Sequence, residues 1–322
     1  MSARAWLLFA GMSLVWGIPY LFIRIAVDEG VPPLLVAWGR VALGALVLLP
    51  IAAQSGALRG VRARLPWVAT FALFEIIVPF PLISYGEVHV ASSLTAILIA
   101  ALPLVVALFT LRFEPEERVG PLRLAGLVCG LAGVVLLVGV DVAGSTQELI
   151  GALCILLATI SYGIGPMIIR TRLRTLDSRG VSAVAPAVGA VVLAPAFAVT
   201  PLHETPPGEA LAAIAVLGVV CTALGFVLFF ALIVEAGAAR AAVITYVNPA
   251  VAVLLGVIVL DEHLGAASIA GLLLILAGSW TATGGGPPPT LRWPRRRPRR
   301  ARGRSSSATS SGAAPAARRG SP

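Results

Sequence analysis

Two charged residues lie deep inside apolar stretches of this sequence, where a charge needs a specific reason. Glu75 stands nine residues after Pro66, and Arg40 stands eight residues after Pro32. At about 1.5 Å of rise per helical residue, they lie roughly 13 Å and 12 Å from the ends of their helices. A charge at that depth in a membrane must be neutralised, paired or placed beside water. Glu75 could therefore carry a coupling proton or bind a substrate amine, or it could be structural, either as one member of a pair or as a neutral, hydrogen-bonded acid.

Two roles fit Arg40. It could pair with Glu75, or it could attract the carboxylate group of a substrate. Its long side chain could also carry the charge part of the way to the surface. Both residues are predicted to face a cavity inside the protein.

Aromatic and polar residues accompany these two charges at helical spacing. Trp16 and Tyr20 are four residues apart and share a helix face, and Thr245 shares another face with Asn248. Converging aromatic and polar groups suit a small amphipathic ligand, although helix packing explains each residue alone about as well. The predicted substrate-cavity residues are Trp16, Tyr20, Arg40, Glu75, Tyr162, Thr245, Tyr246 and Asn248.

Prolines interrupt several of the apolar stretches. Pro79 and Pro81 remove two donors from the ladder of backbone hydrogen bonds in one of them. At membrane depth, the freed carbonyl groups are tolerated only when they are buried in protein or line water. We therefore predict kinks at Pro79, Pro81, Pro103 and Pro249, either beside the cavity or as features of packing.

The composition indicates a membrane protein. Of the 322 residues, 58% are hydrophobic and 12% are charged, whereas about 25% are charged in an ordinary soluble domain. This excludes a soluble enzyme and predicts an all-α polytopic membrane protein. Ten stretches reach the length of about 20 residues that a spanning helix needs. They cover residues 6–27, 32–53, 66–85, 91–111, 122–140, 149–169, 181–199, 210–233, 241–260 and 267–283.

The basic residues predict the topology. All 24 are Arg, and ten of them lie beyond residue 290. Most of the others lie in alternate loops, whereas the intervening loops hold acids, including Glu87, and the three His. The positive-inside rule then places both termini in the cytoplasm, in a plasma (inner) membrane. Residues 284–322 are rich in Arg, Pro and Ser, and they predict a disordered tail that anionic lipid attracts. Nucleic acid is not a predicted partner.

The sequence repeats itself at a spacing of about 146 residues. The stretch from Trp16 to Arg24 matches that from Tyr162 to Arg170, and Pro103 matches Pro249. Because each copy holds five predicted helices, the second copy is inverted in the membrane. We predict a first five-helix repeat at residues 1–140, an inverted repeat at 141–283 and the tail at 284–322. Inverted repeats are typical of secondary transporters that bind substrate near the midplane.

These motifs resemble the EamA-type ten-helix members of the drug/metabolite transporter superfamily over about residues 6–283. The residues that carry the resemblance are Trp16-Gly17 with Arg24, Arg40, Val78-Pro79-Phe80, Pro103 with Pro249, and Glu117 and Glu262 with the glycines that follow them. The resemblance implies transport, often export, of small metabolites such as amino acids or drugs. Leu102 departs from the pattern, since many relatives carry Asn there; Asn248 keeps it in the second half.

Two other functions remain as alternatives. An intramembrane enzyme is disfavoured because the sequence has no HExxH motif, paired intramembrane Asp or Ser/His couple. A channel-like protein is disfavoured, though not excluded, by the inverted repeats. No catalytic residue, cofactor or metal site is predicted. The expected partners are a small-molecule substrate, protons, the lipid bilayer and, at most, a second copy in a weak homodimer.

Five glycines and two acids have predicted structural roles. Glu117 and Glu262 stand at helix boundaries, where they are expected to cap helices or to shape loops. The glycines are expected to let helices pack closely; they are Gly126, Gly130, Gly133, Gly271 and Gly278.

Overall fold

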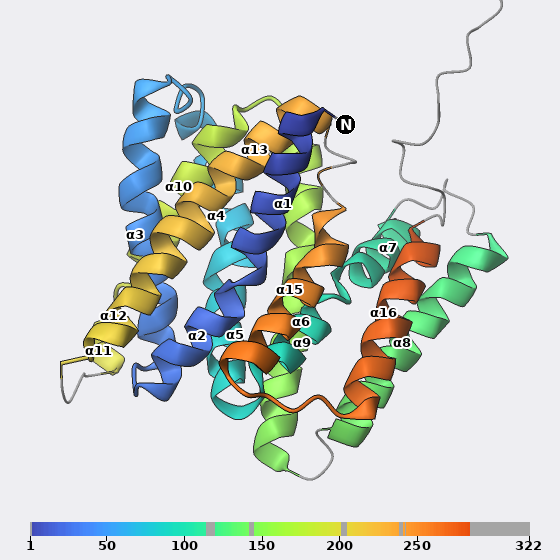
Figure 1. The fold of residues 1–322 in the computed structure, drawn as a ribbon. Coiled ribbons are helices and arrows are strands. Elements are labelled where there is room, and N and C mark those ends of the chain that lie inside the picture. Colours follow the sequence, from blue (N-terminus) through green and yellow to red (C-terminus); the bar gives the residue numbers. More distant parts are fainter. Residues whose placement is uncertain are drawn as a thin grey trace, which may run out of the picture.

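A computed structural model describes residues 2–113, 120–141, 145–200, 205–237, 241 and 243–283. In these ranges every regular element is a helix, and there is no strand (Figure 1). Glu117 and the tail at 284–322 lie outside the described residues.

The described residues of the first half of the chain form eight α-helices. They are α1 (Ala3–Gly17), α2 (Pro19–Asp28), α3 (Pro33–Gln54), α4 (Leu65–Ala72), α5 (Pro79–His89), α6 (Ser92–Ile99), α7 (Leu102–Phe113) and α8 (Pro121–Asp141). A short 3-10 turn, Arg62–Arg64, precedes α4, and a π-helical segment, Leu73–Ile77, joins α4 to α5.

In the second half, the described residues form seven α-helices. Its α-helices are α9 (Thr146–Ile168), α10 (Ser178–Leu193), α11 (Ala196–Val199), α12 (Gly208–Ala215), α13 (Gly225–Ala236), α15 (Ile244–Val259) and α16 (Ala266–Ala282). One π-helical segment, Ile169–Leu173, extends α9, and another, Val216–Leu224, joins α12 to α13.

Among the described residues, seven continuous helical stretches are long and apolar enough to cross a membrane. They are Ala3–Asp28, Pro33–Gln54, Arg62–His89, Ser92–Phe109, Pro121–Val140, Thr146–Leu173 and Gly208–Ala236. Three further apolar helices, α10, α15 and α16, are shorter than 18 residues. Each of the ten predicted segments overlaps one of these stretches, but three fall short, so the count of ten spans stays a prediction. Large apolar side chains such as Leu7 and Val234 are exposed, as expected on faces that meet lipid.

Prolines stand at most of the breaks between consecutive helices. Pro19 opens α2 directly after Ile18, Pro79 opens α5 after the π-helical segment, and Pro103 lies in the first turn of α7. The fixed φ of proline suits a first helical turn, where its missing N–H costs nothing. Pro249, in contrast, lies within a continuous α15. Pro81 is the third residue of α5 and therefore still lies in its first turn.

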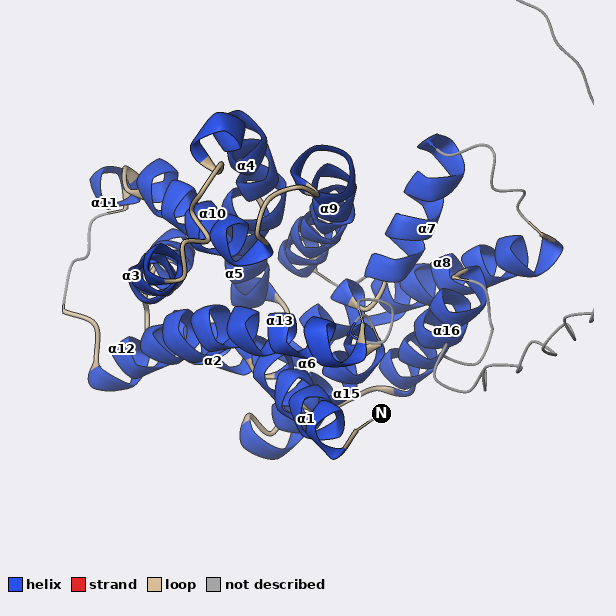
Figure 2. Ribbon diagram, turned by 90° about the horizontal axis from the view of Figure 1, so that it is seen from above, coloured by secondary structure: helices blue, strands red, loops and turns tan. Residues whose placement is uncertain are grey.

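Helices α8 and α16 pack side by side at one lateral edge of the bundle (Figures 1 and 2). Their glycines make this possible. A Cβ built on Gly133 would stand 2.9 Å from the carbonyl oxygen of Gly271, and one on Gly278 would collide with the backbone of Gly130. The two backbones therefore approach as closely as the glycine pattern predicts. This pairing joins the last helix of each predicted half.

Candidate functional site

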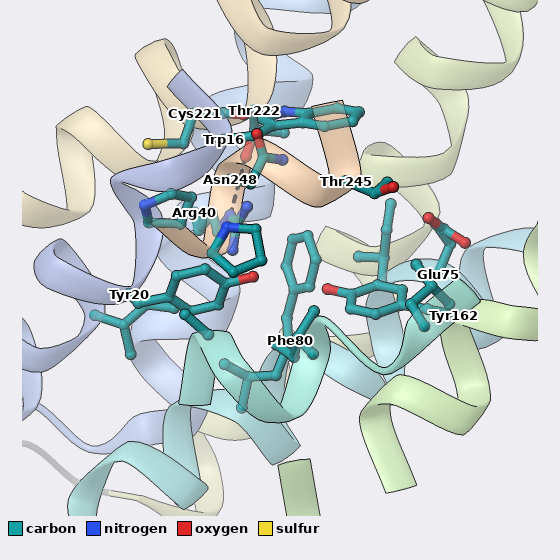
Figure 3. A pocket seen from close by; sticks show the side chains of 18 of the residues that line it. Trp16, Tyr20, Arg40, Glu75, Phe80, Tyr162, Cys221, Thr222, Thr245 and Asn248 are labelled. Carbon is teal, nitrogen blue, oxygen red and sulfur yellow. Dashed lines mark hydrogen bonds between the residues drawn. The ribbon is translucent and has the colours of Figure 1, made fainter. Parts of the chain in front are cut away.

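A cavity of about 190 Å³ lies where the broken helices meet. Its volume corresponds to roughly six water molecules at about 30 Å³ each, which is the scale of a small metabolite. Seven of the eight predicted cavity residues line it, and Figure 3 shows their arrangement; they are Trp16, Tyr20, Arg40, Glu75, Tyr162, Thr245 and Asn248.

Tyr246 is the exception, because it points toward α16. Its hydroxyl lies 3.0 Å from Thr283 Oγ1 and 3.4 Å from the carbonyl oxygen of Ser279, and its ring packs edge-on against Trp280. Consecutive residues of a helix are turned about 100° from each other. The face that directs Thr245 into the cavity therefore directs Tyr246 away from it.

Arg40 is held by neutral groups. Its Nε donates to Thr222 Oγ1 at 3.1 Å, and its guanidinium lies 4.0 Å from the centre of the Phe80 ring. Among the described residues it forms no ion pair, so the predicted pairing with Glu75 is not present. The aromatic face and the hydroxyl fix the guanidinium without cancelling its charge. The cavity thus keeps a positive group that can meet an anionic ligand.

Glu75 lies on the opposite side of the cavity, beside Tyr162 and Thr245 (Figure 3). It belongs to the π-helical segment Leu73–Ile77. Its Oε2 is buried and has no hydrogen-bond partner. The carboxylate packs over Gly165 of α9, where a Cβ would collide with it. An acid in this position can be neutralised by a proton or by a cationic ligand group.

The two π-helical segments at the cavity exchange hydrogen bonds with the opposite half of the chain. A π-helical turn leaves backbone groups without their usual partners in the helix. Ser161 Oγ of α9 donates to the carbonyl oxygen of Phe74 at 2.7 Å. In the reverse direction, Trp16 Nε1 of α1 donates to the carbonyl oxygen of Cys221 at 3.2 Å. Irregular backbone at this depth is thus satisfied by side chains from the opposite half of the chain.

The lining residues also follow the sequence repeat. Six pairs, each with one residue from either half, are separated by the repeat spacing of about 146 residues. The pairs are Trp16 with Tyr162, Glu75 with Cys221, Ile76 with Thr222, Phe80 with Phe226, Ile99 with Thr245, and Leu102 with Asn248. The two halves therefore contribute equivalent positions to one cavity.

Asn248 also connects the two halves. With its amide nitrogen turned toward α1, it donates to the carbonyl oxygens of Ser13 at 3.2 Å and Ile244 at 3.0 Å. Helix α1 also packs closely against α15, the helix of Asn248, because a Cβ on Gly17 would collide with the side chain of Val251. The amide is thus fixed at the cavity wall, whereas its counterpart Leu102 is apolar.

A second hollow of about 700 Å³ opens at the end of the bundle that carries the N-terminus. Leu48, Ile51 and Phe230 form its apolar wall, and Arg4 and Glu235 are among its polar residues. We call it the end groove. Phe226 lines both the end groove and the central cavity. This side chain therefore stands between the two spaces.

Asp177 and Arg179 form a charged pair at the rim of the end groove. Arg179 Nη2 lies 2.7 Å from Asp177 Oδ2, and the backbone N–H of Arg179 donates to Asp177 Oδ1 at 2.9 Å. The hydrogen bonds from the Arg179 side chain hold the pKa of the Asp177 carboxyl below its ordinary value. Asp177 therefore stays ionised at neutral pH and caps the start of α10.

Sequence reasoning missed several cavity residues. Phe226, Cys221 and Thr222 were not selected because they look like ordinary members of an apolar helix. Pro19 was missed because it lies in a stretch that reads as one helix. The repeat spacing could have found Phe226 and Cys221, since it connects them to Phe80 and Glu75.

Comparison with known proteins identifies the family. The family model described as the EamA-like transporter family matches residues 3–139 and again residues 149–284. The chain belongs to the EamA-like transporter family. It is accordingly a multi-pass membrane protein of a transporter family, as the resemblance of its motifs predicted.

Curated relatives agree with this assignment, and a solved structure shares the fold. The chain is 26% identical over 279 residues to the transporter YoaV of Bacillus subtilis, covering 84% of this chain and 94% of that protein. It is 31% identical over 262 residues to the inner membrane transporter YedA of Escherichia coli K12, covering 77% and 80%. A solved crystal structure, titled only as that of a protein, shares the fold with a TM-score of 0.62 at 21% identity, covering 88% of this chain and 98% of that one.

Proposed function

We propose that the protein is a secondary transporter that exports small metabolites across the plasma membrane by alternating access. The observation that carries the proposal is the central cavity, to which both halves contribute equivalent positions. Substrate sites at the interface of two repeats, formed by broken helices, are typical of secondary transporters. The family assignment supports transport, and the cavity supports its mechanism.

The proposal includes ten spanning helices arranged as two inverted repeats. The reciprocal hydrogen bonds at the two π-helical segments support it, because Ser161 binds one half as Trp16 binds the other. If the halves are inverted copies, each can adopt the conformation of the other. Such an exchange converts an inward-open state into an outward-open one around a fixed site.

The cavity suits a small zwitterionic metabolite such as an amino acid. Arg40, which has no acidic partner among the described residues, can bind a carboxylate. Glu75, on the opposite side, can accept an amine or carry a coupling proton. Aromatic rings of Trp16, Phe80 and Tyr162 provide the apolar wall that such a ligand needs.

We propose an orientation with both termini in the cytoplasm and the Arg-rich tail at the inner leaflet. The alternation of Arg-rich and acidic loops supports it. The transporter is expected to work as a monomer or weak homodimer, with no cofactor and no nucleic-acid partner. The proposal that the protein exports its substrate, and does not take it up, rests on the resemblance to the family.

Two measurements test this function. First, the metabolites released by cells with and without the protein are compared, which identifies a candidate substrate. Second, the purified protein is reconstituted in vesicles, and labelled substrate is followed into vesicles preloaded with unlabelled substrate. We expect transient accumulation of label, which Arg40→Gln should reduce and the surface variant Glu209→Gln should not.

The same vesicles separate the alternatives. A channel equilibrates the label without transient accumulation, and an intramembrane enzyme changes the substrate chemically. Either result would overturn the proposal. A pH gradient across the membrane then tests proton coupling, since a coupled exporter should concentrate substrate against its own gradient.

A further inference from the structure

A second buried acid, Glu87, lies outside the central cavity. The sequence predicted it in an outer loop, but α5 continues to His89, and Glu87 lies in the last turns of that helix. Its exposed fraction is 0%, and both of its carboxylate oxygens lack a hydrogen-bond partner. The loop prediction was wrong because the apolar stretch ends before the helix does. No element of the site described above uses this acid.

Arg24 lies beside Glu87 but does not bind its carboxylate. Arg24 Nη1 donates to the main-chain carbonyl oxygen of Glu87 at 2.7 Å, and Arg24 Nε donates to Asp28 Oδ2 at 2.8 Å. The guanidinium thus connects the end of α5 to α2 through the backbone. The charged groups that face Glu87 are Arg24 and Asp28 of α2, Arg40 of α3, and Glu262.

Glu262 joins the two halves next to this acid. It follows α15, and its two carboxylate oxygens accept from the backbone N–H groups of Ser92 at 2.7 Å and Ser93 at 2.9 Å. These amides begin α6 and have no partner within the helix. We call these two hydrogen bonds the outer latch. The predicted capping role of Glu262 is thus fulfilled on a helix of the opposite half.

We propose that Glu87 is a proton-binding site that controls the outer latch, an inference that rests on the proposed alternating-access function. A carboxylate that is removed from water without a partner is costly, so Glu87 holds a proton while the latch is closed. When Glu87 loses its proton, its charge attracts water and the guanidinium groups of Arg24 and Arg40, and it repels the carboxylates of Glu262 and Asp28. The latch then opens, and the two halves can separate at this end.

A proton fits this site better than a metal ion. Among the described residues, no group of three or more His, Cys, Asp or Glu could hold a metal. The Arg24 guanidinium beside the site also repels a cation. The direction of the effect follows: low pH outside closes the latch, and high pH opens it.

The first test detects the proton directly. Infrared difference spectra of the reconstituted full-length protein, recorded between low and high pH, report the carbonyl stretch of protonated carboxylic acids. We expect a band that disappears on raising the pH and that is lost in Glu87→Gln but kept in Glu75→Gln and in the surface variant Glu209→Gln. A spectrum of Glu87→Gln identical to wild type would overturn the proposal, as would a band that depends on replacing potassium by sodium.

The second test follows the latch. Hydrogen exchange of the peptide that contains Ser92 and Ser93 should rise with pH by up to about tenfold per unit beyond its intrinsic rate, because opening releases one proton. In Glu87→Gln the excess should vanish. Glu262→Gln, which leaves Glu87 intact, should show at low pH the same weak protection, relative to the intrinsic exchange rate, that wild type shows at high pH. Equal exchange in wild type and both variants would overturn the proposal.

These measurements need no substrate. A pH-independent latch in a protein that shows counterflow would overturn the role of Glu87 and leave the transport function standing. A pH-dependent latch in a protein without counterflow would overturn the transport function and leave the proton-binding role of Glu87 standing.

Discussion

At the residue scale, the cavity keeps its two charges apart. Arg40 binds Thr222 and the Phe80 ring, whereas Glu75 packs over Gly165. We therefore expect the effects of Arg40→Gln and Glu75→Gln on the free energy of unfolding to add within about 0.5 kcal/mol, as they do for residues without a shared contact. Thermal and denaturant unfolding of the wild type, both single variants and the double variant in detergent provide the cycle. A coupling energy above about 1 kcal/mol would show that the two residues are paired.

Gly165 offers a test of the position of Glu75. A Cβ at this position meets the Glu75 carboxylate, so Gly165→Ala must displace it or strain the helix pair. We expect a loss of about 1–3 kcal/mol of stability, the usual range for overpacking. The loss should shrink when Glu75→Ala first empties the space. Gly11→Ala is the matched control, since nothing lies within 4 Å of a Cβ there.

The residues predicted from the sequence and those that were missed differ for a physical reason. Charges such as Arg40 and Glu75 are conspicuous in apolar helices because their burial is expensive. Phe226 and Cys221 cost nothing to bury, so their types carry no signal. The prediction for Glu87 was wrong in the opposite sense. An acid beside His89 suggested an exposed loop, whereas Glu87 lies in α5 and is fully buried by packing.

At the element scale, the contact between α8 and α16 depends on missing side chains. The backbone of Gly278 faces that of Gly130, and Gly133 faces Gly271. We expect Gly278→Ala to lower the free energy of unfolding by about 1–3 kcal/mol through overpacking. Gly139→Ala, on the partner helix α8 but with open space around its Cβ, should change it little. Unfolding in detergent at matched lipid content measures both, and equal effects would rule out the close contact.

The helix breaks were only partly predictable. The breaks at Pro79 and Pro103 can be predicted from the sequence, because proline cannot continue the ladder of backbone hydrogen bonds. The π-helical segments Leu73–Ile77 and Val216–Leu224 have no such residue within them. One backbone carbonyl in each segment accepts a hydrogen bond from a residue far away in the sequence, Ser161 or Trp16. Local pattern therefore predicts that a helix exists, whereas tertiary contacts decide where it is irregular.

At the scale of the whole molecule, transport requires that the central cavity never opens to both sides at once. Phe226 lines both the central cavity and the end groove. Its ring lies 6.1 Å from that of Trp16 and 6.4 Å from that of Phe230, measured between ring centres. A continuous row of rings thus separates the two spaces at the end that we place in the cytoplasm.

Phe226→Ala should therefore connect the cavity to the end groove. Cys221, which lines the cavity and is buried, reports the connection once Cys129 and Cys154 have been replaced by Ser. We expect a charged, membrane-impermeant thiol reagent to label Cys221 at least several-fold faster in Phe226→Ala than in the parent, and only from the cytoplasmic face of oriented vesicles. Phe230→Ala, which enlarges the end groove alone, should label at the parental rate. Unchanged labelling in Phe226→Ala would show that the barrier lies elsewhere, and faster labelling from the outer face would reverse the proposed orientation.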